Sequence, residues 1–411
     1  MTASTLLFYI AAALLGQLAI GVLVALLKRR SPAGSALPAA IAQPRPDLAW
    51  SGLRTFKVVR RAYEDPAQTQ CSFYLAPEDA APLPDFKPGQ YLTFSLSVAC
   101  DGDATPQKVT RCYSLSDGPV PAHYRVTIKR VPSPASNPAL PPGVSSNYFH
   151  DQVQVGDTLQ VRAPSGHFFI DAKSQTPAVL IAGGIGITPM MSMLRWCLQH
   201  QPERVVHVFY GLRNSSEHAY KQVLESIAAE AKQVQLHVVY SRPLATDRLQ
   251  TDYQHEGHVD ISLLKQQLPH GAHQFYLCGP GAMMESLVPA LSQWGVPNDD
   301  IHFEAFGPAS VRLPGQAPAS KEESSAQPVE IHFTRSGRTV QWTGGEGNLL
   351  DFAEMHGIAV ESGCRSGSCG SCVTPIVSGA VHYDAQPDFE LESGQCLLCV
   401  GKPASALSLE A

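Results

Sequence analysis

The pattern of hydrophobic and polar positions changes several times along this chain of 411 residues. An uncharged apolar run comes first, and short alternating runs separated by Pro, Gly and Asp follow it. Apolar strand-like runs then alternate with helical periodicity, and a shorter alternating segment precedes the C-terminus. A chain of this length and pattern predicts a multi-domain protein with two to three cores.

The first apolar run covers residues 3–27 and contains no charged side chain. Its 25 residues are enough to span a bilayer, and the basic residues 28–30 that follow it favour a cytoplasmic C-terminal side. We therefore expect a single-pass transmembrane helix in the inner (cytoplasmic) membrane, with the soluble domains facing the cytoplasm. Residues 31–48, rich in Pro and Ala, are expected to be a spacer. A signal peptide cleaved near residues 40–42 is the alternative. In signal peptides, however, the basic residues precede the apolar run, whereas here they follow it.

Short β-like runs fill the stretch from Trp50 to about residue 172. Residues 56–59, 91–96 and 124–129 are examples, and Pro, Gly and Asp separate them. Several strands at this spacing predict a small antiparallel β-barrel.

Strands and helices alternate from about residue 177 onward. The continuous apolar run 178–182 is typical of a strand buried on both faces, and the glycine-rich turn 183–189 leads into an apolar-periodic helix over residues 190–198. Further strands are expected at 205–210, 234–240 and 274–278. This alternation predicts an α/β domain with a parallel sheet. The turn departs from G-x-G-x-x-G, so by itself it is a weak dinucleotide signal.

Four cysteines near the C-terminus carry the strongest chemical signal. Cys364, Cys369 and Cys372 follow the spacing C-x4-C-x2-C, and Cys399 lies far downstream. This is the spacing of plant-type [2Fe–2S] ligation, and the small residues between the cysteines let backbone N–H groups approach the cluster. A structural zinc site is the alternative, although zinc ligands usually come as two close pairs. Cys396 competes with Cys399 as the fourth ligand.

Composition and charge narrow the class of protein. With 44% hydrophobic and 16% charged residues the chain is globular, and its ten cysteines in a long chain indicate a reduced compartment with a metal cluster. From Val329 onward ten acidic residues face four basic ones, a difference of −6 that equals the whole net charge. This acidic end excludes nucleic acid as a partner and could steer a basic redox protein, or be only a solvated face.

Several motifs in one order resemble the ferredoxin–NADP reductase family, and flavohaemoglobin reductase modules most of all. The segment Arg111-Cys112-Tyr113-Ser114 has a guanidinium suited to phosphate and an aromatic ring suited to stacking. The other motifs are Pro88-Gly89-Gln90-Tyr91, Gly143-Val144-Ser145-Ser146, Pro164-Ser165-Gly166-His167, the turn from Gly183 to Pro189, and Cys278-Gly279-Pro280. The C-terminal part is similar to a plant-type ferredoxin of the β-grasp fold, with strands at 329–334 and 339–342 and a helix at 348–356. The same fusion occurs in oxygenase and hybrid-cluster-protein reductases.

The resemblance implies which residues hold the flavin. They are Arg111, Tyr113, Ser114, Ile128, Lys129, Gly143, Ser145, Ser146 and Phe306. FAD is favoured over FMN, because a helix that starts near Gly143 would direct N–H groups at a pyrophosphate. Phe306 is either a cover over the flavin or ordinary core.

The resemblance also implies a nicotinamide site and catalytic residues. The coenzyme residues are Gly183, Gly184, Gly186, Thr188, Pro189, Ser241, Arg242, Cys278, Gly279 and Met283. Ser241 and Arg242 favour NADPH over NADH, since arginine suits a 2′-phosphate, but both coenzymes remain open. Ser114, Cys278 and Glu304 are the implied catalytic residues, and a packed small residue is the alternative for Cys278.

The expected domains are an FAD-binding barrel at 49–173, an NAD(P)-binding domain at 174–307, a linker at 308–327 and a ferredoxin domain at 328–411. By resemblance we expect a reductase that passes electrons from NAD(P)H through FAD and a [2Fe–2S] cluster to a redox-protein acceptor, and the apolar run 3–27 adds a membrane anchor to this expectation. An oxygenase, hydroxylase, desaturase or hybrid-cluster protein could be that acceptor, in the membrane or outside it.

Two alternatives belong to other functional classes. A respiratory NADH:quinone-type subunit has the same modules, but there the ferredoxin part precedes the flavin part, whereas here it follows. A membrane-tethered protein that binds zinc and nucleotide without catalysis is the other alternative. It would be colourless after purification.

Overall fold

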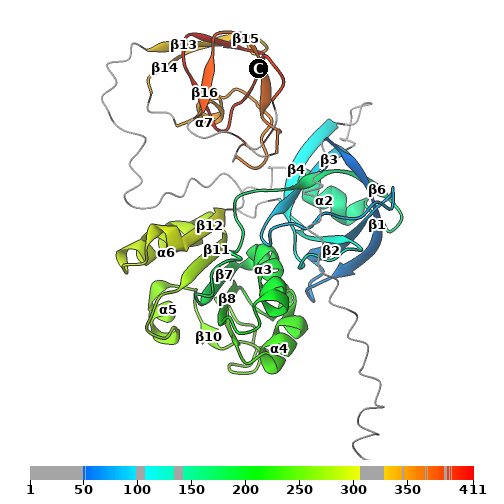
Figure 1. Cartoon of the computed structure of the whole chain (residues 1–411), viewed down its shortest axis with the longest axis vertical. Coiled ribbons are helices and arrows are strands. Elements are labelled where there is room, and N and C mark those ends of the chain that lie inside the picture. Colours follow the sequence, from blue (N-terminus) through cyan, green and yellow to red (C-terminus); the bar gives the residue numbers. More distant parts are fainter. Residues whose placement is uncertain are drawn as a thin grey trace, which may run out of the picture. The chain divides into compact units, whose positions relative to one another are not determined.

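The computed structural model describes residues 50, 52–98, 107–133, 142–305, 328–344, 347–365, 367, 369–383, 387, 389 and 391–411. The expected transmembrane helix, spacer and linker, and Phe306, lie outside these residues. Within them the chain forms an antiparallel sheet, a parallel sheet with helices, and a smaller C-terminal sheet (Figure 1).

The expected transmembrane helix and inner-membrane localisation are corrected by the structure. No helix in the described part of the chain is long and apolar enough to cross a membrane. The longest of these helices, α3 (Ile187–His200), has 14 residues. At about 1.5 Å per residue it would extend ~21 Å, which is short of a hydrocarbon core of about 30 Å. Residues 3–27 themselves lie outside the described part.

The first sheet forms the expected antiparallel barrel. Its strands are β1 (Arg54–Tyr63), β2 (Gln70–Pro77), β3 (Tyr91–Val98), β4 (Gln107–Ser114), β5 (Tyr124–Lys129) and β6 (Thr158–Ser165). They pair in the order β4-β3-β6-β1-β2-β5. A bridge between Leu115 and Val126 joins the two ends of this order, so the sheet closes. Phe56, Phe73 and Phe94 are fully buried inside it.

The second sheet is parallel, as the alternating pattern predicts. Its strands are β7 (Ala178–Gly183), β8 (Val206–Leu212), β9 (Val234–Tyr240), β10 (His255–Glu256), β11 (Gln274–Gly279) and β12 (Ile301–Ala305). The order is β10-β9-β8-β7-β11-β12. The helices are α3, α4 (Lys221–Glu230), α5 (Ile261–Gln267) and α6 (Gly281–Gln293), with short 3₁₀ turns at Gly184–Gly186, Ser215–Glu217 and Asn298–Asp300.

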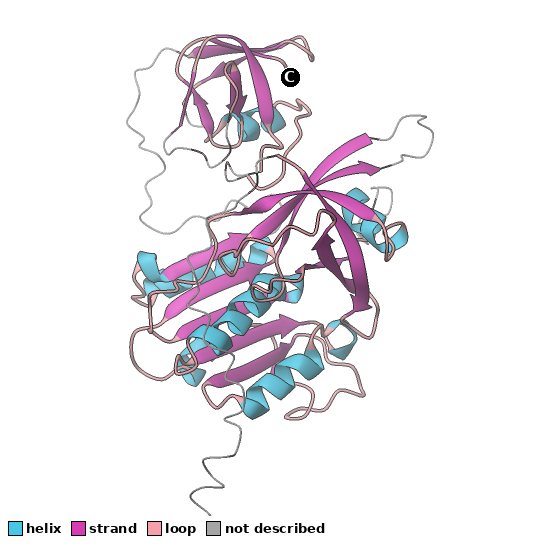
Figure 2. Cartoon of the chain, turned by 45° about the vertical axis from the view of Figure 1, so that its right-hand side comes forward, coloured by secondary structure: helices cyan, strands magenta, loops and turns pink. Residues whose placement is uncertain are grey.

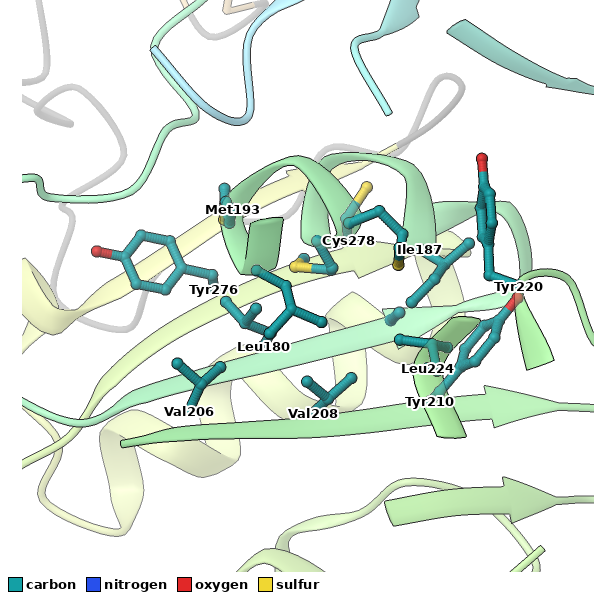
Figure 3. Packing of buried hydrophobic residues seen from close by; sticks show 14 of the residues in the cluster. Leu180, Ile187, Met193, Val206, Val208, Tyr210, Tyr220, Leu224, Tyr276 and Cys278 are labelled. Atoms are coloured by element: carbon teal, nitrogen blue, oxygen red, sulfur yellow. The ribbon is translucent and has the colours of Figure 1, made fainter. Parts of the chain in front are cut away.

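Helices cover both faces of this sheet, which explains why β7 is apolar along its whole length (Figure 2). On one face Leu180, Val206 and Val208 lie under α3 and contact the same core as Ile187 and Met193 (Figure 3). On the other face a second core joins residues of β7 and β11 to α5 and α6.

The C-terminal part forms a five-stranded sheet in the order β14-β13-β19-β15-β17, with one helix and a separate strand pair. Its elements are β13 (Val329–Phe333), β14 (Arg338–Trp342), α7 (Leu349–Met355), β15 (Val373–Ser378), β16 (Val381–Tyr383), β17 (Gln395–Leu397), β18 (Gly401–Pro403) and β19 (Leu407–Leu409). The side chain of Asn348 caps α7 by accepting a hydrogen bond from the Asp351 N–H. Both predicted strands and the predicted helix of this part are confirmed.

Candidate active site

The parallel sheet reverses its strand order between β7 and β11. The chain moves outward from β7 through β8 to β10 on one side, whereas β11 and β12 lie on the other. Ligands of open α/β sheets bind at such a switch point, beyond the carboxyl ends of the strands. The glycine turn after β7 and the Cys278-Gly279-Pro280 segment after β11 therefore meet where a dinucleotide site is expected.

Close backbone approach explains the glycines of this turn. A Cβ on Gly186 would lie 2.0 Å from the carbonyl oxygen of Cys278, and a Cβ on Gly183 would lie 3.0 Å from Met283 Sδ. Gly184 has a φ of 53°, in the left-handed region that favours glycine. The structure thus brings together predicted coenzyme residues from two strand ends that are far apart in the sequence.

Thr188 and Pro189 lie at the start of α3 and are both buried. The Thr188 hydroxyl donates to the Ile185 carbonyl at 2.9 Å, which stabilises the tight entry into the helix. Because both side chains are buried and stabilise the turn, a ligand can contact only the backbone of this segment.

The three predicted catalytic residues are neighbours. Cys278 in β11 pairs with Glu304 in β12, and Ser114 at the end of β4 lies close enough to the Glu304 carboxyl to lower its pKa. A thiol, a carboxyl and a hydroxyl thus meet between the barrel and the parallel sheet. Cys278 belongs to the core beside Ile187 under α3 (Figure 3).

Burial keeps the acid and the thiol of this group protonated near neutral pH. Burial of the carboxyl, followed by the charge of Cys364, raises the pKa of Glu304 to about 8, while Ser114 acts in the opposite direction. Although the residue as a whole is half-buried, its Oε2 atom is fully buried and has no hydrogen-bond partner among the described residues. Burial, and then the charge of Glu304, raise the pKa of the Cys278 thiol well above its usual value.

The flavin residues of the barrel converge on Tyr113. Its hydroxyl hydrogen-bonds Ser145 Oγ of α2 (Val144–Asp151) at 2.9 Å, and its ring packs edge-on against Phe94 and Phe149. Burial of the hydroxyl raises the pKa of Tyr113 to about 12. The ring is only partly buried, so the residue offers a fixed, neutral stacking surface.

Arg111 and Gly143 complete this side of the site. Arg111 is exposed, and its Nη1 donates to the Thr110 carbonyl at 2.7 Å. A Cβ on Gly143 would lie 2.6 Å from Ser146 Oγ, which leaves room only for glycine at the N-terminus of α2. No side chain caps this end of the helix, so its first N–H groups are available to an anion.

Ile128 and Lys129 are placed differently from the other predicted flavin residues. The Ile128 side chain is 1% exposed in the barrel core, so only its backbone can reach a ligand. Lys129 forms an ion pair with Glu217 of the parallel domain at 2.5 Å. The Lys129 side chain therefore lies at the junction between the barrel and the parallel sheet, where Glu217 holds its ammonium group.

Ser241 and Arg242 follow the carboxyl end of β9. Ser241 Oγ donates to the Leu212 carbonyl at 3.2 Å, and the Arg242 N–H donates to the Arg213 carbonyl at 2.8 Å. Arg213, an exposed arginine directly after β8, therefore lies beside Arg242 in the backbone. The sequence reasoning missed Arg213, although its place after a parallel strand was the available signal.

The cysteines of the C-terminal part form a cradle of mutually close sulfur atoms. The Cys364 N–H donates to Cys369 Sγ at 3.2 Å, the Cys369 N–H to Cys364 Sγ at 3.3 Å, and the Cys399 N–H to Cys372 Sγ at 3.4 Å. Cys396 differs, since its thiol donates to the Thr374 carbonyl in β15. The geometry favours Cys399 as the fourth member of the set.

The residues around these sulfurs fit a [2Fe–2S] cluster. A Cβ on Gly370 would lie 2.1 Å from the Phe389 ring, and a Cβ on Gly363 would lie 2.9 Å from Cys369 Sγ. Glycine is therefore required where the loop wraps the thiols, and N–H groups directed at sulfur are the environment that such clusters need.

Sequence profiles of three families match the chain. An oxidoreductase FAD-binding domain matches residues 70–170, an oxidoreductase NAD-binding domain matches 180–288, and a 2Fe-2S iron-sulfur cluster binding domain matches 331–404. The flavohemoprotein of Oceanobacillus iheyensis is 39% identical over 259 residues, and that of Rhizobium meliloti is 38% identical over 259 residues. The first match covers 63% of this chain and 60% of the relative, so the chain spans about 60% of the length of these relatives.

Two solved structures resemble the chain over different extents. The FAD/NAD binding domain of nitric oxide dioxygenase from Vibrio cholerae is 31% identical, with a TM-score of 0.54, and the match covers 62% of this chain and 100% of that one. Phthalate dioxygenase reductase is 26% identical, with a TM-score of 0.50, and the match covers 88% of this chain and 98% of that one.

Proposed function

The chain belongs to the ferredoxin–NADP reductase family, with a flavin and nicotinamide module fused to a C-terminal [2Fe–2S] ferredoxin domain, and we propose that it supplies electrons to an oxygenase. It is an oxidoreductase that uses NAD(P)H, FAD and a [2Fe–2S] cluster. The carrying observation is the Ser114, Glu304 and Cys278 group at the switch point, in a chain that also contains the four-thiol cradle.

The similarity to phthalate dioxygenase reductase supports an oxygenase as the acceptor. That match extends over nearly the whole of both chains, whereas the flavohemoprotein matches cover 63% of this chain. The reductase named for phthalate dioxygenase combines pyridine nucleotide oxidation with a [2Fe–2S] group, which is the combination found here. A hydroxylase, a desaturase or a hybrid-cluster protein would use the same electron supply, and the test below distinguishes an oxygenase from a hybrid-cluster protein.

We also propose the domain boundaries 49–173, 174–307 and 328–411. Strands β1 to β6 fall within the first range, β7 to β12 within the second, and β13 to β19 within the third. The hydrophobic cores follow nearly the same division, with Phe168 and Ile170 of the first range packed into the core of the second.

The residues of the site orient and shield the cofactors. When bound, the flavin takes a hydride from the nicotinamide and the cluster carries single electrons. Tyr113 stacks with its neutral ring, held by Ser145, and Arg111 binds phosphate as a planar donor. Glu304 holds a proton on its buried carboxyl, beside the Ser114 hydroxyl. Cys278 stays a neutral thiol, so its small side chain would pack against the nicotinamide ring without acting as a nucleophile.

For the coenzyme we propose NADPH before NADH. Ser241, Arg242 and the neighbouring Arg213 place one hydroxyl and two exposed guanidinium groups after β8 and β9. Two arginines would bind a 2′-phosphate through charge-assisted hydrogen bonds. Arg213 also pairs with Glu217 at 3.3 Å, so a phosphate would compete with that carboxylate for its guanidinium.

The proposal is tested with the purified full chain and candidate acceptors. We expect a coloured protein with FAD and acid-labile sulfide, whose flavin bleaches when NADPH or NADH is added without oxygen. An oxygenase component added next should be reduced and should turn over its substrate. Turnover with a hybrid-cluster protein but with no oxygenase would move the acceptor to that class. A colourless protein without sulfide would contradict the proposal.

A further inference from the structure

Four histidines form a row on one face of the parallel sheet, outside the site described above. His207 lies in β8, His237 in β9 and His255 in β10, which are adjacent strands, and His273 directly precedes β11. The ring centroids of His255 and His237 are 5.7 Å apart, those of His237 and His207 6.2 Å, and those of His207 and His273 6.0 Å. His207 and His273 lie toward the amino ends of β8 and β11, whereas His255 pairs with Val239 near the carboxyl end of β9.

The row contains buried ring nitrogens without partners. Both nitrogens of His207, Nε2 of His237 and Nε2 of His273 have no hydrogen-bond partner among the described residues. His207 is only 5% exposed and His273 only 6%. Buried nitrogens are normally paired, so several unpaired ones in one row call for a ligand or another functional explanation.

Two nitrogens of the row have the spacing of metal ligands. His237 Nδ1 and His255 Nε2 are 3.4 Å apart. Two imidazole nitrogens that each lie about 2.0–2.1 Å from one tetrahedral zinc ion are about 3.3 Å from each other. We propose that His237 and His255 bind one transition-metal ion of the zinc, nickel or copper type, with His207 as the nearest further imidazole.

The chemistry of the row selects this class of ion. Imidazole suits zinc, copper and nickel, whereas magnesium and calcium prefer carboxylate oxygens. Burial is the first cause that lowers the pKa of His207, His237, His255 and His273, so the row presents neutral imidazoles, the form that binds metal.

The protein supplies only part of the ligand set of this metal site, and the site is open to solvent. We therefore expect weak, exchangeable metal binding. Among the described residues, no third metal-ligating side chain converges with His237 and His255 on one point. His237 and His255 are half-buried, and β10 is the edge strand of the sheet, so an ion and its water ligands can reach them. Binding would be exchangeable and would tie the two-residue strand β10 to β9, which stabilises this edge of the domain.

The test uses oxidised full-length protein with its flavin and cluster in place, so that the ferredoxin cysteines are occupied. Zinc chloride is titrated by calorimetry, and copper(II) is added for electron paramagnetic resonance. We expect about one zinc ion bound per chain, a higher melting temperature with zinc, and a copper signal split by imidazole nitrogens. His255→Asn should weaken zinc binding at least about tenfold and remove the nitrogen splitting.

His258→Asn is the matched control, because this histidine is exposed and lies three residues further along the same segment. It should bind zinc like the native chain. Flavin and iron content verify folding, and His255→Gln replaces His255→Asn if the latter loses flavin. Absence of zinc binding by the native protein would overturn the proposal and leave the 3.4 Å contact as a hydrogen bond between two imidazoles. Equal affinities of the His255 and His258 variants would overturn it as well.

Discussion

At the scale of single residues, the candidate active site depends on groups that are neutral because they are buried. Glu304 is the clearest case, since burial raises its pKa to about 8. An ionised carboxyl at this place would have to lose most of its hydration. The same reasoning keeps Cys278 a thiol, so both groups are uncharged near neutral pH.

Replacing Glu304 by glutamine should change how stability depends on pH. The native carboxyl is protonated below about pH 8, whereas in the unfolded chain it ionises near the usual 4.5. Stability from this group is therefore fully present below pH 4.5 and is lost as the pH rises to 8, by about 1.4 kcal/mol per pH unit at most. Urea unfolding of apoprotein at pH 5 and pH 8 should show this loss in the native chain and not in Glu304→Gln. Glu256→Gln, at an exposed position, should behave like the native chain.

Replacing Cys372 by serine should separate the two electron carriers. We expect Cys372→Ser to keep NAD(P)H-dependent reduction of ferricyanide and to lose reduction of cytochrome c, because a cluster ligand is gone while the flavin site is untouched. Cys396→Ser should keep both activities, since the Cys396 thiol donates to the Thr374 carbonyl. If ferricyanide reduction fell equally in a folded, flavin-loaded Cys372→Ser protein, the proposed order of carriers would be wrong.

At the scale of elements, the unit of β7, the glycine turn and α3 determines where the coenzyme can lie. β7 is buried along its whole length, and the turn brings α3 against the end of β11. The requirement for glycine is steric at Gly186 and conformational at Gly184. Two neighbouring glycines in one turn are thus needed for different reasons.

Alanine at these two glycines should give unequal losses. Gly186→Ala places a Cβ 2.0 Å from the Cys278 carbonyl oxygen, so backbone must move. We expect a loss of several kcal/mol, on the scale of overpacking at a rigid site, and much weaker coenzyme binding. Gly184→Ala meets no atom within 4 Å and adds only left-handed strain of about 1–2 kcal/mol. Chemical denaturation measures the stability of each variant, and coenzyme titration measures its affinity for the coenzyme. Equal losses of stability in the two variants would refute the steric explanation.

The junction of α4 and β9 contains a buried histidine that makes this element acid-sensitive. His218 is 1% exposed, and its Nδ1 lies 2.7 Å from the Tyr240 hydroxyl. Burial, followed by the charge of Lys221, lowers the pKa of His218 to about 3, and Asp252 and Asp247 act in the opposite direction. The native protein therefore holds this imidazole neutral at almost any working pH.

Stability should fall as the pH drops from about 6.5 toward 3, because the unfolded chain protonates this histidine and the native chain does not. The slope from one such group is about 1.4 kcal/mol per pH unit, and the stability is fully present above pH 6.5. Urea unfolding at pH 4.5 and pH 6.5 measures how the free energy of unfolding changes with pH. In His218→Gln this change should be smaller by the contribution of one proton. The exposed His258→Gln should leave the slope unchanged.

At the scale of the whole molecule, a polar network joins the barrel to the parallel domain. The Tyr220 hydroxyl, at the start of α4, hydrogen-bonds the hydroxyls of Thr127 and Ser72 of the barrel, and the Arg125 guanidinium lies 5.1 Å from the Tyr220 ring centroid. Tyr220 has a φ of 59°, and its N–H donates to the Glu64 carbonyl. These contacts hold Ser114 of the barrel next to Glu304 of the parallel sheet.

Removing the Tyr220 hydroxyl should loosen this junction without unfolding either part. We expect Tyr220→Phe to cost about 1–2 kcal/mol, because Thr127 keeps its hydrogen bonds to Ser72 and Ser116. Calorimetry should show a lower first melting transition, and NAD(P)H-driven flavin reduction should slow. Tyr63→Phe, at a residue that is 43% exposed, should change neither measurement.

Much of this architecture followed from local pattern. Alternation predicted the barrel, apolar runs with helical periodicity predicted the parallel sheet, and cysteine spacing predicted the cradle, because each depends on neighbours in the sequence. The membrane helix was the exception. An apolar run meets the length requirement for a span, but the described helices do not provide one.

Contacts between distant segments were decided only by the tertiary structure. Cys278 and Glu304 become neighbours through strand pairing, and Ser114 joins them from another sheet; their raised pKa values come from burial that no local pattern encodes. The pairing of Lys129 with Glu217, the position of Arg213 beside Arg242 and the row of histidines have the same origin. The sequence determines which chemical groups are present and on which strands and helices they lie. Packing determines which groups lose their water and meet, because burial and distance depend on the whole fold.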